Sequence, residues 1–145
     1  MMKKLIVSMC CSFALFFSQY TIAGQFETFG DTEVHYISFP STFLSPEIAK
    51  NYGIERSSYV AVVNISVLDA SSDQKTPMKA NVAGSARNLI GNAKELEFKE
   101  IVETGAIYYI ATVSYANQET FRFTIDVTAD GKTNTLKFQN MFYTD

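Results

Sequence analysis

Apolar and polar residues alternate with a period of two along most of the chain, which indicates β-strands. The clearest case is Phe121–Thr128, in which four apolar residues alternate with four polar ones. This pattern predicts that Phe123 and Ile125 point into a core, whereas Arg122 and Thr124 face solvent. One face of this strand is therefore expected to be buried and the other to be exposed to solvent.

Six or seven further segments show strand patterns, with turn residues between them at short intervals. Two of them, Tyr59–Leu68 and Ala106–Tyr115, are apolar on both faces at their middle, as is typical of central strands. Gly84 suggests a bend or bulge in its strand, and the apolar phase of Glu95–Glu103 breaks near Lys99-Glu100. The predicted strands are Gln25–Phe29, Thr32–Phe39, Tyr59–Leu68, Met78–Arg87, Glu95–Glu103, Ala106–Tyr115, Phe121–Thr128 and Thr135–Tyr143.

One helix interrupts the strand pattern. Ser45 is a good N-cap residue, Pro46 suits the first helical position, and Glu47 complements the positive end of the helix dipole. Gly53 can adopt the left-handed conformation that ends many helices. Together these residues predict a helix of about two turns, Pro46–Tyr52.

Seven or eight short strands with one short helix predict an all-β fold. We expect an antiparallel, immunoglobulin-like β-sandwich. A small closed β-barrel, which uses the same kind of strands, is the alternative.

The first residues have the features of a secretory signal peptide, predicted at residues 1–23. Met1–Lys4 provides a positive start, Leu5–Phe17 is uncharged and mostly apolar, and Thr21-Ile22-Ala23 places small residues at the cleavage positions. The apolar run is too short to span a bilayer of roughly 30 Å. We therefore expect a single domain at residues 24–145 in the periplasm, with no membrane span after the signal is removed.

Composition narrows the possible chemistry of this domain. The only cysteines, Cys10 and Cys11, lie in the predicted signal peptide, so the mature domain has no disulfide and no thiolate metal site. Removal of Lys3 and Lys4 leaves 10 Lys and Arg against 15 Asp and Glu, a formal charge of −5. This acidic balance argues against nucleic acid or an anionic lipid surface as a partner.

No arrangement of residues typical of an enzyme stands out. His35 is the only histidine, and we expect it to have a structural or hydrogen-bonding role, because no second histidine or cysteine could complete a metal site with it. Glu95 and Glu97 would lie about 6.6 Å apart on one strand face, but Lys99 continues that face and the pattern is that of a solvated edge strand. We therefore predict no catalytic, cofactor-binding or metal-binding residues.

The aromatic residues offer another possibility, a binding surface. The connection from Phe39 to Ile54 is long for a link between two strands, and long ordered loops are often functional. We predict a binding surface made of Phe39, Phe43, Leu44, Tyr52, His35 and Tyr36. The alternative is that the helix only caps the open end of the core.

Several segments resemble a known bacterial family. Gln25–Asp31, Ser41–Leu44, Pro46–Ala49, Tyr52–Ile54 and Val63–Val67 are similar to the pattern of domain-of-unknown-function family 4426. The resemblance covers essentially all of the mature chain. It implies an exported single-domain protein of Gram-negative bacteria, and it implies no activity, ligand or catalytic residue. Other matching segments are Val34–Tyr36, Leu96–Phe98, Ile107–Thr112, Phe138-Gln139 and Phe142-Tyr143.

The sequence therefore favours a non-enzymatic periplasmic module that binds a protein, a peptide or a small apolar ligand. Two alternatives remain open. The first is an envelope-assembly subunit that docks by strand addition. The second is an enzyme whose carboxylates and tyrosines come together only in the fold.

Overall fold

The computed structural model describes residues 25–145, so the predicted signal peptide and Gly24 lie outside the described residues. No helix in the described part of the chain is long and apolar enough to cross a membrane. The elements are β1 (Gln25–Phe29), β2 (Thr32–Pro40), a 3-10 helix (Ser41–Phe43), α1 (Pro46–Tyr52), β3 (Val60–Asp69), β4 (Thr76–Pro77), β5 (Asn81–Asn88), β6 (Ala93–Leu96), β7 (Lys99–Glu103), β8 (Ala106–Ser114), β9 (Glu119–Ala129) and β10 (Lys132–Phe142).

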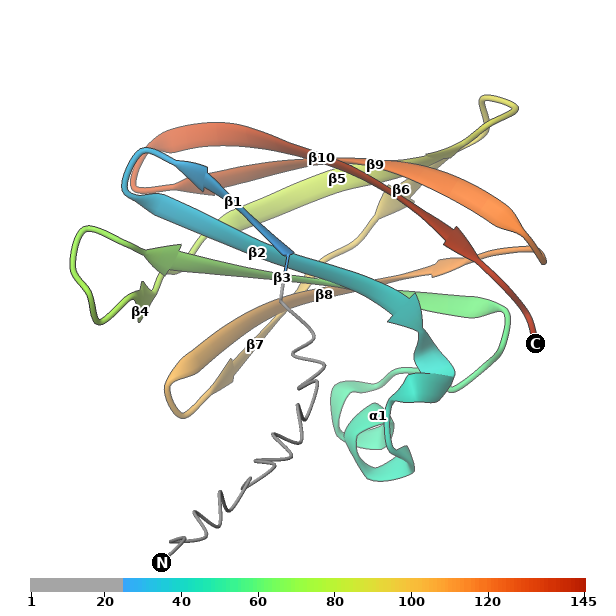
Figure 1. Cartoon of the computed structure of the whole chain (residues 1–145). Coiled ribbons are helices and arrows are strands. Elements are labelled where there is room, and N and C mark those ends of the chain that lie inside the picture. The colour runs from blue at the N-terminus through green and yellow to red at the C-terminus, as the bar shows by residue number, and fades with distance from the viewer. Residues whose placement is uncertain (1–24) are drawn as a thin grey trace, which may run out of the picture.

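Two antiparallel sheets form the body of the molecule (Figure 1). Sheet A has the strand order β1-β2-β3-β8-β7, with β4 paired to β3. Sheet B has the order β10-β9-β5-β6. Both sheets keep free edge strands, so the described residues form the predicted sandwich and not a closed barrel.

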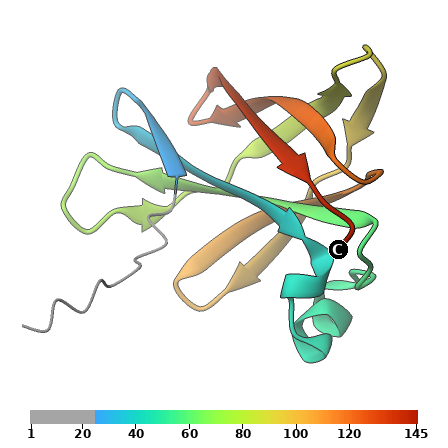
Figure 2. The same ribbon diagram turned by 45° about the vertical axis from the view of Figure 1, so that its right-hand side comes forward.

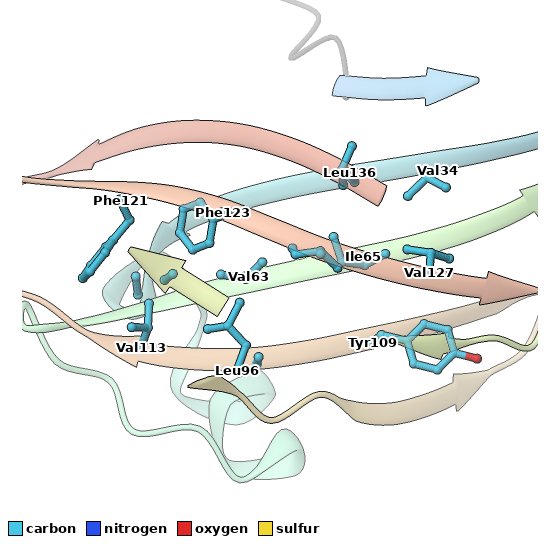
Figure 3. Packing of buried hydrophobic residues seen from close by; sticks show 14 of the residues in the cluster. Val34, Val63, Ile65, Leu96, Tyr109, Val113, Phe121, Phe123, Val127 and Leu136 are labelled. Atoms are coloured by element: carbon cyan, nitrogen blue, oxygen red, sulfur yellow. The ribbon is translucent and has the colours of Figure 1, made fainter. Parts of the chain in front are cut away.

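The core lies between the two sheets, and the phase predicted for Phe121–Thr128 from the alternation is confirmed. Phe123 and Ile125 of β9 are 1% and 0% exposed, while Arg122 and Thr124 are exposed. Side chains from sheet B meet those from sheet A in this layer, as Figure 3 shows for Phe123 and Val63. Burial of these apolar groups is the main contribution that stabilises the fold.

Within residues 25–145 ten strands form in place of the seven or eight expected, because β4 was not predicted and another predicted strand is divided by a change of sheet. The predicted strand Glu95–Glu103 is interrupted at Glu97-Phe98, two residues before the predicted irregularity. Its first part, β6, pairs with β5 in sheet B, and its second part, β7, pairs with β8 in sheet A. Leu96 is buried and Phe98 packs against the core. The prediction that Glu95, Glu97 and Lys99 share one strand face is therefore wrong.

Gly84 does not mark a bulge, contrary to the expectation from sequence. The pairing of β5 with β9 runs without interruption past Gly84, which lies opposite Ile125. A Cβ atom at Gly84 would come within 2.5 Å of the Thr124 carbonyl oxygen and 2.9 Å of the Ile125 Cα. Glycine is therefore needed here because the neighbouring backbone approaches too closely for a side chain.

The helix has the predicted bounds, and its ends have the predicted caps. Ser45 Oγ accepts a hydrogen bond from the Ile48 N–H at 3.2 Å, and Gly53 takes the left-handed conformation (φ 68°). The Ile54 N–H then donates to the Ala49 carbonyl at 2.8 Å. Figures 1 and 2 both place α1 beside sheet A, on the side away from sheet B.

Candidate functional site

The connection between β2 and β3, residues 41–59, is held to the sandwich by polar contacts at its base. Ser41 is fully buried, and its hydroxyl donates to the Ser57 carbonyl at 3.1 Å and accepts from the Ser57 N–H at 2.8 Å. The Arg56 guanidinium donates to the carbonyl oxygens of Leu44 and Thr42 at 2.8 and 3.2 Å. These contacts fix where α1 lies on the sheet.

A cavity of about 220 Å³ lies between α1 and the outer face of sheet A. On β3, Ala61 and Val63 point into the core, so Val62 and Asn64 point to the opposite face. Val62 and Ile110 of the cavity are 1% and 8% exposed. We call this cavity the helix pocket, and its lining residues are Phe39, Leu44, Ile48, Tyr52, Ile54, Val62, Asn64, Tyr108 and Ile110.

Asn64 provides a buried polar atom in the otherwise mostly apolar helix pocket. It lies opposite Ile37 of β2 and Ile110 of β8, so its neighbours across the sheet are aliphatic. Its Oδ1 atom is buried and accepts no hydrogen bond from the described residues. An unpaired buried acceptor costs about 1–3 kcal/mol. A ligand N–H or O–H could satisfy this atom once the side chains that cover it move aside.

Tyr52 contributes a hydroxyl group that stays protonated at neutral pH. The hydroxyl donates a hydrogen bond to the Glu103 carboxylate on β7. This hydrogen bond, followed by burial and the charge of Glu103, raises the pKa of Tyr52 to about 12. The pair also ties the end of α1 to the last residue of β7. Tyr52 is therefore a hydrogen-bonding and positioning group, and not a base at neutral pH.

The structure brings together three of the six residues predicted as a binding surface. Phe39, Leu44 and Tyr52 line the helix pocket. Phe43 is 77% exposed and does not line it, although its ring stacks at 6.4 Å from that of Phe39. Instead, Phe43 borders a separate cavity of about 300 Å³ together with Met141 and other residues near the C-terminus.

The other two predicted residues, His35 and Tyr36, lie on opposite faces of β2. Tyr36 packs against the core, with its ring stacked at 4.5 Å on Phe138. His35 lies on the outer face, where its ring stacks at 5.1 Å on Phe26. Neither residue lines the helix pocket. Adjacent residues of a strand point to opposite faces, so the two could not share one surface.

His35 has the predicted hydrogen-bonding role. Its Nε2 lies 2.6 Å from Oε1 of Glu33, which is 5% exposed, and Lys75 Nζ lies 3.2 Å from the other carboxylate oxygen. Burial tends to raise the pKa of Glu33, but the hydrogen bonds and charges of His35 and Lys75 hold this pKa below its ordinary value. Within residues 25–145, no group of three or more His, Cys, Asp or Glu side chains could hold a metal ion.

Sequence reasoning missed most of the helix pocket. The apolar outer positions of the predicted strand Tyr59–Leu68, such as Val62, were a usable signal, because an apolar outer face must be covered. Asn64 interrupts this apolar run and could have been noticed for that reason. Tyr108 and Ile110 could not have been assigned to the pocket, because their position depends on the pairing of β3 with β8.

A family model for a domain of unknown function, DUF4426, matches residues 26–145. The chain belongs to this family. A crystal structure of a DUF4426 family protein from Pseudomonas aeruginosa is similar, with 37% identity and a TM-score of 0.75, and the match covers 87% of this chain and 99% of that chain. No curated protein matches the chain.

More distant solved structures share the fold. FetP from uropathogenic Escherichia coli, expressed recombinantly in the periplasm, has 10% identity and a TM-score of 0.60, over 83% of this chain and 93% of that chain. A copper-bound variant of FetP has 12% identity and a TM-score of 0.57, over 83% and 95% of the two chains. At this level of identity, the likeness concerns the fold alone.

Proposed function

We propose that this protein is a non-enzymatic binding module of the periplasm that holds an apolar side chain of a peptide or protein in the helix pocket. The observation that carries the proposal is a mostly apolar cavity lined by Asn64, whose buried Oδ1 has no hydrogen-bond partner among the described residues. Binding sites commonly combine apolar walls with a few polar groups that orient the ligand. In the helix pocket, Asn64 is the group that would orient it.

The size of the cavity favours a single side chain as the occupant. Its volume of about 220 Å³ is below the roughly 300–1,000 Å³ of typical small-molecule sites. Leu44, Ile54 and Val62 can pack around an aliphatic or aromatic group of limited size. A backbone N–H next to that group can donate to Asn64. A peptide residue with an apolar side chain supplies both features.

The proposal of a non-enzymatic role is supported by the character of the pocket lining. Six of its nine side chains are hydrocarbon, and the polar ones are Asn64 and the hydroxyls of Tyr52 and Tyr108. The raised pKa of Tyr52 keeps its proton in place at neutral pH. These groups are suited to hydrogen bonding with a ligand rather than to proton transfer.

The proposed periplasmic location rests on the predicted signal peptide at residues 1–23. FetP, which shares the sandwich, was also expressed in the periplasm. Intact-mass measurement of the exported protein tests this part of the proposal. We expect the mass of a chain beginning at Gly24, and a mass that retains the first 20 residues would contradict it.

N-acetyl-leucine amide is a suitable probe for the pocket, because it carries one apolar side chain and two amide groups that donate through N–H. We expect it to shift the methyl resonances of Leu44, Ile48 and Ile54 in NMR spectra. The Asn64→Leu variant, which keeps a side chain of similar size, should weaken binding by at least about tenfold, the loss expected for an unmade buried hydrogen bond.

A change far from the pocket provides the control. Leu89→Ser alters an exposed side chain at the β5–β6 turn and should leave binding of the probe unchanged. The proposal fails if the methyl shifts map outside the helix pocket, or if Asn64→Leu binds the probe as well as the unmodified protein does.

A further inference from the structure

Three positively charged residues lie on neighbouring strands, on the outer face of sheet B. Arg87 of β5 lies directly opposite Arg122 of β9, and Arg122 lies opposite Gln139 of β10. Lys137 lies opposite Thr124, two residues along β9 from Arg122 and therefore on the same face. The three residues come from three different strands, and only the strand register places them together.

Among the described residues, no carboxylate balances the charges of this cluster. The guanidinium groups donate to neutral acceptors instead, Arg87 to the Gly91 carbonyl at 2.8 Å and Arg122 to Oε1 of Gln139 at 3.3 Å. Neither Arg87, Arg122 nor Lys137 forms an ion pair with any residue in the range 25–145. The nearby Asp126 carboxylate accepts a hydrogen bond from Thr135 at 2.7 Å. Like charges directly opposite on neighbouring strands are destabilising. An anion that bound between the two arginines would remove this repulsion.

The cluster surrounds a hollow in the surface, of about 420 Å³. Ser85 and Thr124 place hydroxyl groups in the lining, and no carboxylate contributes to it. This volume falls within the roughly 300–1,000 Å³ of small-molecule sites. The lining residues are Ser85, Arg87, Arg122, Phe123, Thr124, Lys137, Phe138 and Gln139.

We propose that this hollow binds a small polyanion that carries phosphate groups. Guanidinium groups can bind phosphate oxygens in pairs, and an ammonium group adds a compact positive charge. A small ligand is favoured over an extended one because residues 25–145 as a whole carry a charge of −5. An extended polyanion would be repelled beyond the cluster, whereas a small one stays within the roughly 8 Å over which charges act at physiological salt. This site is independent of the helix pocket.

Inorganic pyrophosphate at physiological ionic strength is the probe for this site, with binding measured by calorimetry and by amide shifts in NMR spectra. We expect shifts at Ser85, Arg122 and Thr124. The double variant Arg122→Gln with Lys137→Gln should weaken binding by about tenfold or more, because two charge-assisted contacts are lost. Orthophosphate and sulfate, run in parallel, should bind more weakly than pyrophosphate if two anionic groups are recognised together.

A second double variant, Lys50→Gln with Lys132→Gln, changes the net charge by the same amount at residues outside the hollow. It should leave the affinity for pyrophosphate within about twofold, since charges further away than a Debye length are largely screened. Equal weakening in both double variants would overturn the proposal. Absence of binding to the unmodified protein at millimolar pyrophosphate would overturn it too, as would tighter binding of a DNA duplex than of pyrophosphate.

Discussion

The outer faces of the two sheets differ in what covers them. On sheet A, the central strand β3 places Val62 on its outer face, and residues 41–59 with α1 cover part of this face. On sheet B, the corresponding strand β9 places Arg122, Thr124 and Asp126 on its outer face, and these residues are exposed to solvent. An apolar outer face must be shielded from water, and a polar one need not be.

This difference explains why each face offers a different kind of site. Incomplete covering of an apolar face leaves the helix pocket, which suits an apolar side chain. An uncovered polar face can carry charged side chains on neighbouring strands. On sheet B, three positively charged residues line a hollow. The same alternating pattern thus leads to two surfaces with different chemistry.

The largest expected effect on stability comes from placing a charge on the outer face of sheet A, where residues 41–59 cover it. Val62→Asp should lower the free energy of unfolding by about 3–5 kcal/mol, because the carboxylate would be buried without a partner. Thr124→Asp makes a similar change on the outer face of sheet B and should stay within about 0.5 kcal/mol of the unmodified protein. Urea unfolding of both variants tests this difference. Similar losses in the two variants would show that the two faces are equally covered.

Removing the unpaired acceptor from the helix pocket should have the next largest effect. We expect Asn64→Leu to raise the free energy of unfolding by about 1–3 kcal/mol, because a buried polar atom without a partner is replaced by hydrocarbon. Thermal and denaturant unfolding measure this change. Combined with the expected loss of probe binding, the gain would show that Asn64 serves binding at the expense of stability. A destabilised variant would mean that Asn64 supports the fold.

A smaller gain is expected on sheet B from relief of like-charge repulsion. Arg122→Gln should stabilise the protein by about 0.2–1 kcal/mol at low salt, because Arg87 then has no like charge directly opposite. The gain should shrink as salt is added, since salt screens exposed charges. Denaturant unfolding at two salt concentrations measures both effects, with Lys132→Gln as the control. A gain that does not depend on salt would contradict an electrostatic origin.

The smallest effect concerns Tyr52 at high pH. Its folded-state pKa of about 12 lies above the ordinary tyrosine value of 10.0, so its contribution to stability is complete below pH 10 and is lost between pH 10 and 12. Tyr52→Phe should therefore show a smaller loss of stability across this window than the unmodified protein. The pKa of Tyr52 itself is measured from the change in absorbance on tyrosine ionisation, taken as the difference between the two proteins. If the difference titration of the two proteins has its midpoint near pH 10, the Tyr52–Glu103 pair is not formed in solution.

Local pattern was sufficient to predict the fold class and the helix. Alternation in Phe121–Thr128 reports which side chains are buried, because the side-chain period of a strand is two. The bounds of Pro46–Tyr52 follow from Ser45 and Gly53, which act on the helix ends next to them in the chain. Such features depend on residues that are close in sequence, and they can therefore be predicted from the sequence alone.

Both candidate sites depend on residues that are far apart in sequence. Asn64 meets Ile110, and Arg87 meets Arg122, only because of the register between their strands. The change of sheet at Glu97-Phe98 and the close approach at Gly84 also follow from how the sheets pack. The sequence by itself determined most of the strands, the buried face of Phe121–Thr128 and the capped helix. Strand order and register decided which outward side chains became neighbours, because these are set by packing of the whole chain and not by local alternation.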